Sequence, residues 1–105
     1  MIIEIQKLMD SRRVWSDKTF ANGKFTHARA LSISYQLQKK SLRLTEATEA
    51  FLRSPCDQAA MDLNGGLADV LLLLLDCASH LGVSAQSLLL YANQKHTLNI
   101  EHNRD

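Results

Sequence analysis

The sequence predicts an all-α fold, a bundle of four to five helices, on three observations. With 105 residues the chain is long enough for one domain with a real core but not for two, so we expect a single domain over residues 1–105. It has one proline and four glycines, and good helix formers such as Leu, Ala, Gln, Lys, Arg and Glu dominate. Apolar residues recur at helical spacing along most of the chain.

The first half of the chain predicts two helices and the start of a third. An apolar stripe extends from Ile2 to Val14 and closes in the polar segment 16–18. A turn signal at 21–24 precedes a long helical pattern from about Thr26 to about Arg53. Ser54-Pro55-Cys56-Asp57 then predicts a helix start, with Ser54 as N-cap and proline at the first helical position.

The second half predicts a buried helix and a last helix. Asn64-Gly65-Gly66 is expected to break or weaken the helical pattern, because consecutive glycines are poor in helix interiors. Leu67 to Leu81 is then the most apolar stretch and predicts a buried helix capped by Gly82. Ser84 is expected to cap the last helix, which runs from Ala85 to about His102.

The long helical segment carries two apolar stripes on opposite sides. The second stripe passes through Leu31, Tyr35 and Leu42, and Glu46 and Glu49 continue it. A single small chain can hardly cover both sides of one helix, so this second stripe predicts oligomer formation.

Composition limits the class of partner and the compartment. The net charge is +1 and the basic residues are scattered, which argues against binding a nucleic-acid polymer. The N-terminus lacks the pattern of a signal peptide, and the leucine run, interrupted by Asp69 and Asp76, is too short for a membrane span. We therefore expect a cytoplasmic protein with no membrane partner, in which Cys56 and Cys77 are reduced thiols.

Two acids, Asp69 and Asp76, lie inside the leucine-rich stretch, where an unpaired carboxylate is costly. Glu46-x-x-Glu49 places two further carboxylates on one helical face. If two antiparallel helices bring Glu46, Glu49 and Asp69 to one point, three oxygen ligands with retained waters suit magnesium. The alternatives are a solvated face for the two glutamates and a hydrogen bond to a neighbouring helix for Asp69. The four histidines show no helical zinc-pair spacing and are interpreted as surface or packing residues: His27, His80, His96 and His102.

These residues resemble the MazG-type all-α nucleoside triphosphate pyrophosphohydrolases. The family pattern is Glu-x-x-Glu, a gap, then Glu-x-x-Asp inside a Leu-rich helix. Glu46-Ala47-Thr48-Glu49 is similar to the first half, and Gly66-Leu67-Ala68-Asp69 lies where the second half belongs. Three other segments are similar to family features, covering most of the chain: Trp15 to Phe20, Leu81-Gly82-Val83-Ser84, and Lys95 with Asn99.

The resemblance implies a MazG-like helical domain that hydrolyses a nucleoside triphosphate to the monophosphate and pyrophosphate. It implies magnesium as cofactor, held by Glu46, Glu49 and Asp69 as the catalytic residues. It further implies contacts from Lys95 and Asn99 to phosphate or sugar, and dimers or tetramers in which helices of two subunits complete one site. Trp15 is a candidate to stack on a base, with core packing as its alternative.

One departure from the family pattern bears on catalysis. Gly66 stands where the third of four acids belongs, and a three-acid site binds metal more weakly. Asp62 would share a side with Asp69 if the helix continued through the glycines, whereas Asp76 is interpreted as a hydrogen-bonding or ligand-supporting residue. The alternative function is therefore a non-catalytic MazG-like nucleotide-binding or structural oligomer. A plain helical partner-binding module would bind no magnesium.

Overall fold

Four helices form the described chain, and no strand occurs in residues 1–20 and 26–102, so the predicted all-α class is confirmed. The computed structural model describes the backbone of these residues and the side chains of residues 1–18 and 28–102. The helices are α1 (Ile2–Phe20), α2 (Thr26–Arg53), α3 (Asp57–His80) and α4 (Ala85–Glu101). The predicted turn at 21–24 and the side chains of Phe20 and His27 lie outside the described residues.

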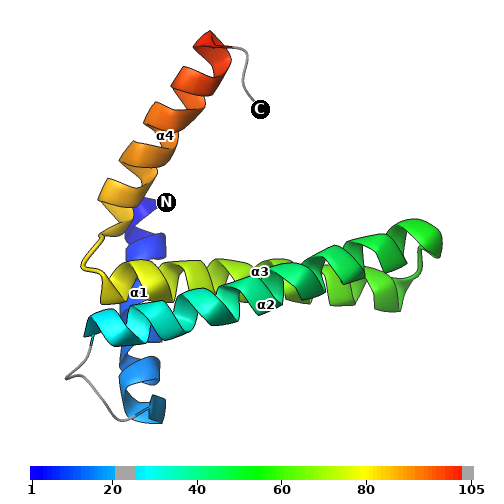
Figure 1. Cartoon of the computed structure of the whole chain (residues 1–105), viewed down its shortest axis with the longest axis horizontal. Coiled ribbons are helices and arrows are strands. Elements are labelled where there is room, and N and C mark those ends of the chain that lie inside the picture. The colour runs from blue at the N-terminus through cyan, green and yellow to red at the C-terminus, as the bar shows by residue number, and fades with distance from the viewer. Residues whose placement is uncertain (21–25, 103–105) are drawn as a thin grey trace.

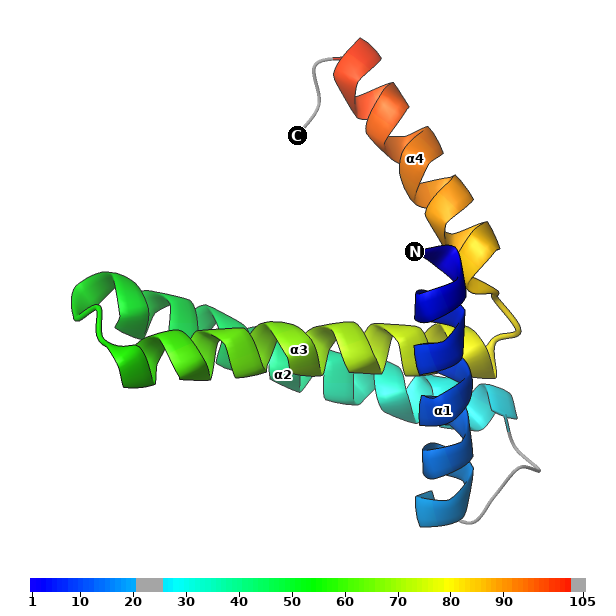
Figure 2. The ribbon, with the colours of Figure 1, turned by 180° about the vertical axis from the view of Figure 1, so that it is seen from behind.

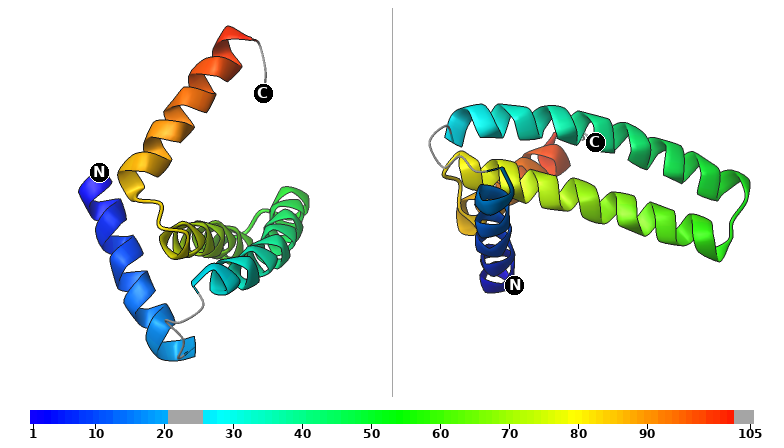
Figure 3. Two further views of the ribbon diagram at one scale, coloured as in Figure 1. Left: turned by 60° about the vertical axis from the view of Figure 1, so that its left-hand side comes forward. Right: turned by 90° about the horizontal axis from the view of Figure 1, so that it is seen from below.

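The helix pair α2 and α3 forms an antiparallel hairpin whose arms lie side by side along their length (Figures 1 and 3). Helix α1 crosses this hairpin at the end where α2 begins and α3 finishes (Figure 2). Helix α4 is bent by 113° from α3 and packs against α1 near its own first turns. The molecule is therefore an open arrangement in which two helices cover one end of a long hairpin.

The main apolar cluster lies where α1, the end of α3 and the start of α4 meet. Its buried members are Met9, Leu75, Ala78 and Ala85. Ile5, Val83 and Leu88 pack around them and are partly buried. Between α2 and α3, three further apolar residues are buried: Ala30, Ile33 and Leu73. The hairpin is thus anchored at one end, and its far end depends on contacts between its two arms.

Helix α1 extends six residues beyond the predicted end at Val14. The polar residues that were expected to end it stay helical, because one of them is buried and another is paired. Ser16 points inward and is buried, and Arg13 pairs with Asp17 one turn later through Nε at 3.2 Å. Polar residues with local or buried partners do not end a helix as solvated ones do.

Helix α3 differs from prediction at its start and in its middle. Cys56, not Ser54, is the N-cap, and its Sγ accepts a hydrogen bond from the Ala59 amide at 3.4 Å. The expected break at Asn64-Gly65-Gly66 does not occur, because α3 is continuous from Asp57 to His80. Packing along α2 supplies the stabilisation that the two glycines lack, since the low intrinsic propensity of glycine is overridden by tertiary contact.

The junction of α3 and α4 confirms two predictions. Helix α3 ends at His80, and Gly82 beyond it has a φ of +76°, the left-handed conformation that favours glycine. The Val83 amide bonds the Ala78 carbonyl at 2.9 Å, which completes the helix end. Ser84 is the N-cap of α4, and its hydroxyl accepts from the Ser87 amide at 3.2 Å.

The prediction that Leu67 to Leu81 is a buried helix is correct for only part of its surface. Leu73 and Leu75 are buried, but three leucines on one side of α3 and its C-cap residue are exposed: Leu67, Leu71, Leu74 and Leu81. No single helix in the described chain is long and apolar enough to cross a membrane; α3 and α4 meet that condition only jointly, across their 113° bend.

Candidate functional site

The register of the α2–α3 hairpin decides which residues face the predicted acid Asp69. The Lys40 Nζ lies 3.5 Å from the Asp69 Oδ2 as an ion pair between the two helices. One turn earlier on α3, a Cβ placed on Gly66 would meet the Leu44 side chain at 3.4 Å. The residues of α2 that face Gly66 and Asp69 are therefore Leu44 and Lys40, not Glu49 and Glu46.

The side of α2 that packs against α3 is not the side that carries Glu46 and Glu49, although Glu46 also borders an open hollow near the hairpin turn. Ala30, Lys40 and Leu44 mark the side that contacts α3. At 3.6 residues per turn, both glutamates project roughly 150° around the helix axis from that side. They are exposed, and as predicted they continue the outer stripe of Leu31, Tyr35 and Leu42. Within one chain, Glu46 and Glu49 do not meet Asp69.

These positions do not fit a magnesium ion. Asp69 is half-exposed, and the group beside it is the ammonium of Lys40, which would repel a divalent cation. Among the described residues, no three His, Cys, Asp or Glu side chains come close enough together to hold a metal. Within a single chain, the three predicted ligands therefore do not come together as a metal site.

Asp62 lines a hollow together with Glu46, and Asp69 does not line it. Because α3 is continuous, Asp62 and Asp69 share a side of the helix, two turns apart. Asp62 and Glu46 both line an open hollow of about 490 Å³ near the hairpin turn, together with Arg43. The Asp62 Oδ1 accepts a hydrogen bond from the Gln58 Nε2 at 2.9 Å. This hollow brings together two acids and one cation from both arms of the hairpin.

The predicted substrate contacts lie on other helices. Lys95 and Asn99 are four residues apart on the outer half of α4, where Lys95 is exposed and Asn99 partly buried. This half of α4 projects away from the hairpin, so neither residue is near Asp69 (Figure 1). Trp15 is half-exposed on α1, and the Arg12 guanidinium lies 3.9 Å from its ring centroid, a cation–π contact. The chain does not bring these three residues together with the acids.

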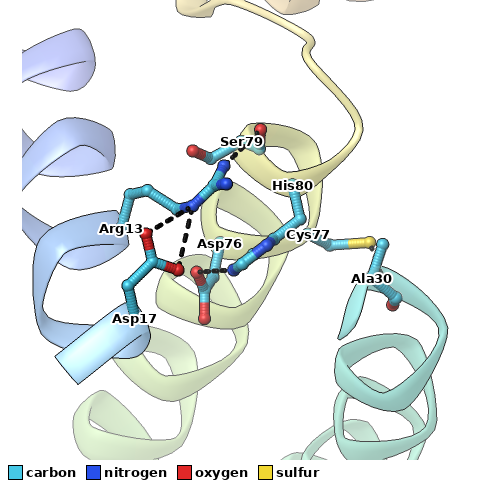
Figure 4. A network of polar contacts seen from close by, with 7 residues as sticks. All are labelled: Arg13, Asp17, Ala30, Asp76, Cys77, Ser79 and His80. Atoms are coloured by element: carbon cyan, nitrogen blue, oxygen red, sulfur yellow. Dashed lines mark hydrogen bonds and ion pairs between the residues drawn. The ribbon is translucent and has the colours of Figure 1, made fainter. Parts of the chain in front are cut away.

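A buried polar cluster that the sequence did not predict lies between the helices. Asp76 and His80 are on one side of α3, and the Asp76 Oδ1 is 3.5 Å from the His80 Nε2 (Figure 4). Their side chains are 2% and 1% exposed, and Ser16 on α1 is buried beside them. The four-residue spacing of Asp76 and His80 inside the most apolar helix was the available signal, since it places the two on one face.

Charged groups of both neighbouring helices act on this cluster. Burial raises the pKa of Asp76, against the opposing effects of His80, Arg12, Arg29 and Ser16. Burial also lowers the pKa of His80; Arg13 and Arg29 lower it further, while Asp76 and Asp17 oppose the shift. The same desolvation, with the charge of Asp76, raises the pKa of the Cys77 thiol, which donates to the Ala30 carbonyl at 3.6 Å.

The cluster joins helices and does not contact solvent. Arg13 reaches from α1 to the end of α3, where its Nη1 donates to the Ser79 carbonyl at 3.1 Å (Figure 4). A substrate cannot reach Asp76 or His80, because both are almost fully covered. The role predicted for Asp76 as a hydrogen-bonding residue therefore becomes that of a buried partner for His80 at the α1 contact.

Comparison with models of known protein families, with curated proteins and with solved structures finds no match for this chain.

Proposed function

We propose that this chain is a non-catalytic MazG-like helical domain that acts as a structural, self-associating unit. The observation that carries the proposal is the ion pair between Lys40 and Asp69. In the family that the sequence resembles, acids of two helices hold magnesium. Here Lys40 supplies a positive charge at the one acid that remains in the second half of the pattern, so the hairpin is neutralised without a metal.

Two further observations support the same conclusion. Gly66 offers no carboxylate beside Asp69, and Glu46 and Glu49 face the opposite side of α2. Metal-dependent phosphoryl chemistry needs several oxygen ligands around the ion to neutralise the developing charge. A single half-exposed carboxylate paired to a lysine does not provide them.

The proposal is tested by incubating the full chain and magnesium with each canonical nucleoside triphosphate and several damaged ones, and measuring pyrophosphate. We expect no release above the protein-free blank. The matched variant is the double substitution Lys40→Glu with Gly66→Glu, which restores acids around Asp69, since a Cβ at position 66 makes only ordinary contact with Leu44. Magnesium-dependent release by the wild type that disappears in Asp69→Asn would overturn the proposal.

A second candidate function is the magnesium-dependent nucleoside triphosphate pyrophosphohydrolase itself. It is favoured by the hollow in which Glu46 and Asp62 lie with Arg43. In that case the same assay would give release that is lost in Glu46→Gln and in Asp62→Asn. Glu4→Gln is the control, because Glu4 is exposed on α1 and does not line the hollow, and its loss should leave release unchanged.

A further inference from the structure

The exposed leucines of α3 form a regular seam. Leu67, Leu71, Leu74, Ala78 and Leu81 follow one another at intervals of four, three, four and three residues. This is the spacing of alternating a and d positions in a coiled coil, which keeps one line of side chains facing a partner helix. The four leucines are 42 to 52% exposed, whereas Ala78 is covered by the core cluster. We call these five residues the α3 seam.

The rest of the chain covers only one end of the α3 seam. Helix α2 lies along a different side of α3, which is marked by Gly66, Asp69 and Cys77. Helices α1 and α4 lie at the end of α3 and meet it near Leu75 and Ala78 (Figures 2 and 3). Among the described residues, Leu67, Leu71 and Leu74 therefore stay exposed. The apolar line that begins in the core therefore continues into solvent.

The exposed surface of the chain is larger than a monomer of this size requires. Its accessible area is 7836 Å² for a mass of 11.8 kDa. A folded monomer of that mass exposes about 5,900 Å², so the excess is about 1,900 Å². The radius of gyration of 15.9 Å also exceeds the roughly 13 Å of a compact domain of this length. Two such chains that buried this excess would fall within the roughly 2,000–5,000 Å² of obligate homodimers.

We propose that a second copy of this chain docks on the α3 seam, with the two α3 helices antiparallel and centred on Leu71. In this arrangement Leu74 faces the partner's Leu67, and the two hairpins form a four-helix bundle. The antiparallel direction follows from α1, because parallel α3 helices would bring both α1 helices to the same end. The proposal rests on the proposed structural function and specifies its interface, which differs from the outer α2 stripe expected from the sequence.

The test is the mass of the full chain by sedimentation equilibrium at micromolar concentration. We expect a dimer for the wild type and a monomer for Leu71→Glu. Leu90→Glu is the matched control, because Leu90 on α4 is 56% exposed but lies outside the α3 seam, and it should remain a dimer. A wild-type monomer would overturn the proposal. So would a dimer that survives Leu71→Glu and dissociates in Leu42→Glu, since Leu42 belongs to the outer α2 stripe.

A crosslinking measurement covers the case in which Leu71→Glu fails to fold. In a Cys56→Ser background, Leu71→Cys should form a disulfide-linked dimer under mild oxidation, because residues at the centre of an antiparallel pair face each other. Leu90→Cys should stay monomeric on a denaturing gel. Equal crosslinking of both would contradict the seam. Pyrophosphate release does not enter either readout, so failure of the seam and failure of the non-catalytic proposal are distinguishable.

Discussion

At the scale of single residues, burial outweighs the neighbouring charge at both members of the Asp76–His80 pair. The pKa of His80 is lowered, so the folded chain binds fewer protons there than the unfolded chain does. Stability from this group is complete above about pH 6.5 and decreases as the pH falls below that value. Asp76 acts in the opposite sense, because its raised pKa favours the protonated form and its contribution decreases as the pH rises.

The lowered pKa of His80 therefore predicts that the fold loses stability in acid. We expect the free energy of unfolding, measured by urea titration at fixed protein concentration, to fall between pH 7.5 and pH 5.5, and His80→Gln to reduce this fall. His96→Gln is the control, because His96 is exposed on α4. If the wild type and His80→Gln showed the same pH dependence, burial of the imidazole would not be its cause.

The sequence indicated which acidic residues need a partner, but it did not indicate which residues those partners are. Asp69 and Asp76 both needed an explanation as acids in an apolar helix, and the structure gives each a cation or potential cation, Lys40 and His80. The partners could not be predicted for Asp69, because they depend on the register of the hairpin. Glu46 and Glu49 lie six and nine residues beyond Lys40. Either one would face Asp69 only if α2 both slid by that many residues and rotated, which local spacing does not reveal.

At the scale of helices, replacing two different glycines by alanine is expected to change the free energy of unfolding in opposite directions. Gly65 lies inside α3 with no atom within 4 Å of an added Cβ, so Gly65→Ala should raise the free energy of unfolding by about 0.5–1 kcal/mol. Gly82 has a φ of +76°, so Gly82→Ala should lower it by roughly 1–2 kcal/mol. Urea titration of both variants checks this. Destabilisation by Gly65→Ala would indicate that α3 is interrupted there after all.

The docking of α4 on α1 depends on the side chain of Gln6, which lies on α1 and caps the start of α4. The Gln6 Oε1 accepts a hydrogen bond from the buried Ala85 amide at 2.8 Å, at the first residue of α4. Gln6→Ala leaves that amide unpaired and should cost about 1–3 kcal/mol. The measurement is the free energy of unfolding, together with hydrogen exchange at Ala85. Gln58→Ala, on an exposed turn of α3, serves as control and should change stability little.

The apolar periodicity predicted that the helices exist, but it did not predict all of their ends. The range Thr26–Arg53 was predicted correctly because its apolar stripe is continuous and its flanks are clear. The C-terminal end of α1 and the start of α3 were misplaced, since Ser16 is buried by a contact distant in sequence and Cys56 takes the capping role. Such contacts are tertiary, and local helix propensity does not reveal them.

At the scale of the whole molecule, the leucine-rich helix shows that hydrophobicity alone does not distinguish a core helix from an interface helix. Apolar composition predicted that Leu67 to Leu81 would be buried, yet four leucines of this stretch are exposed in the single chain. A core and an interface have the same composition, and only the arrangement of the other helices distinguishes them. The open arrangement of α1 and α4 in this structure turns a predicted core helix into the proposed dimer contact.

In the proposed function, Lys40 supplies the positive charge at Asp69, so that this hairpin needs no metal. Calorimetric titration of magnesium into the full chain tests it most directly. We predict no heat beyond dilution for the wild type, and saturable binding for the double variant Lys40→Glu with Gly66→Glu. Stoichiometric magnesium binding by the wild type that is lost in Asp69→Asn would contradict the account.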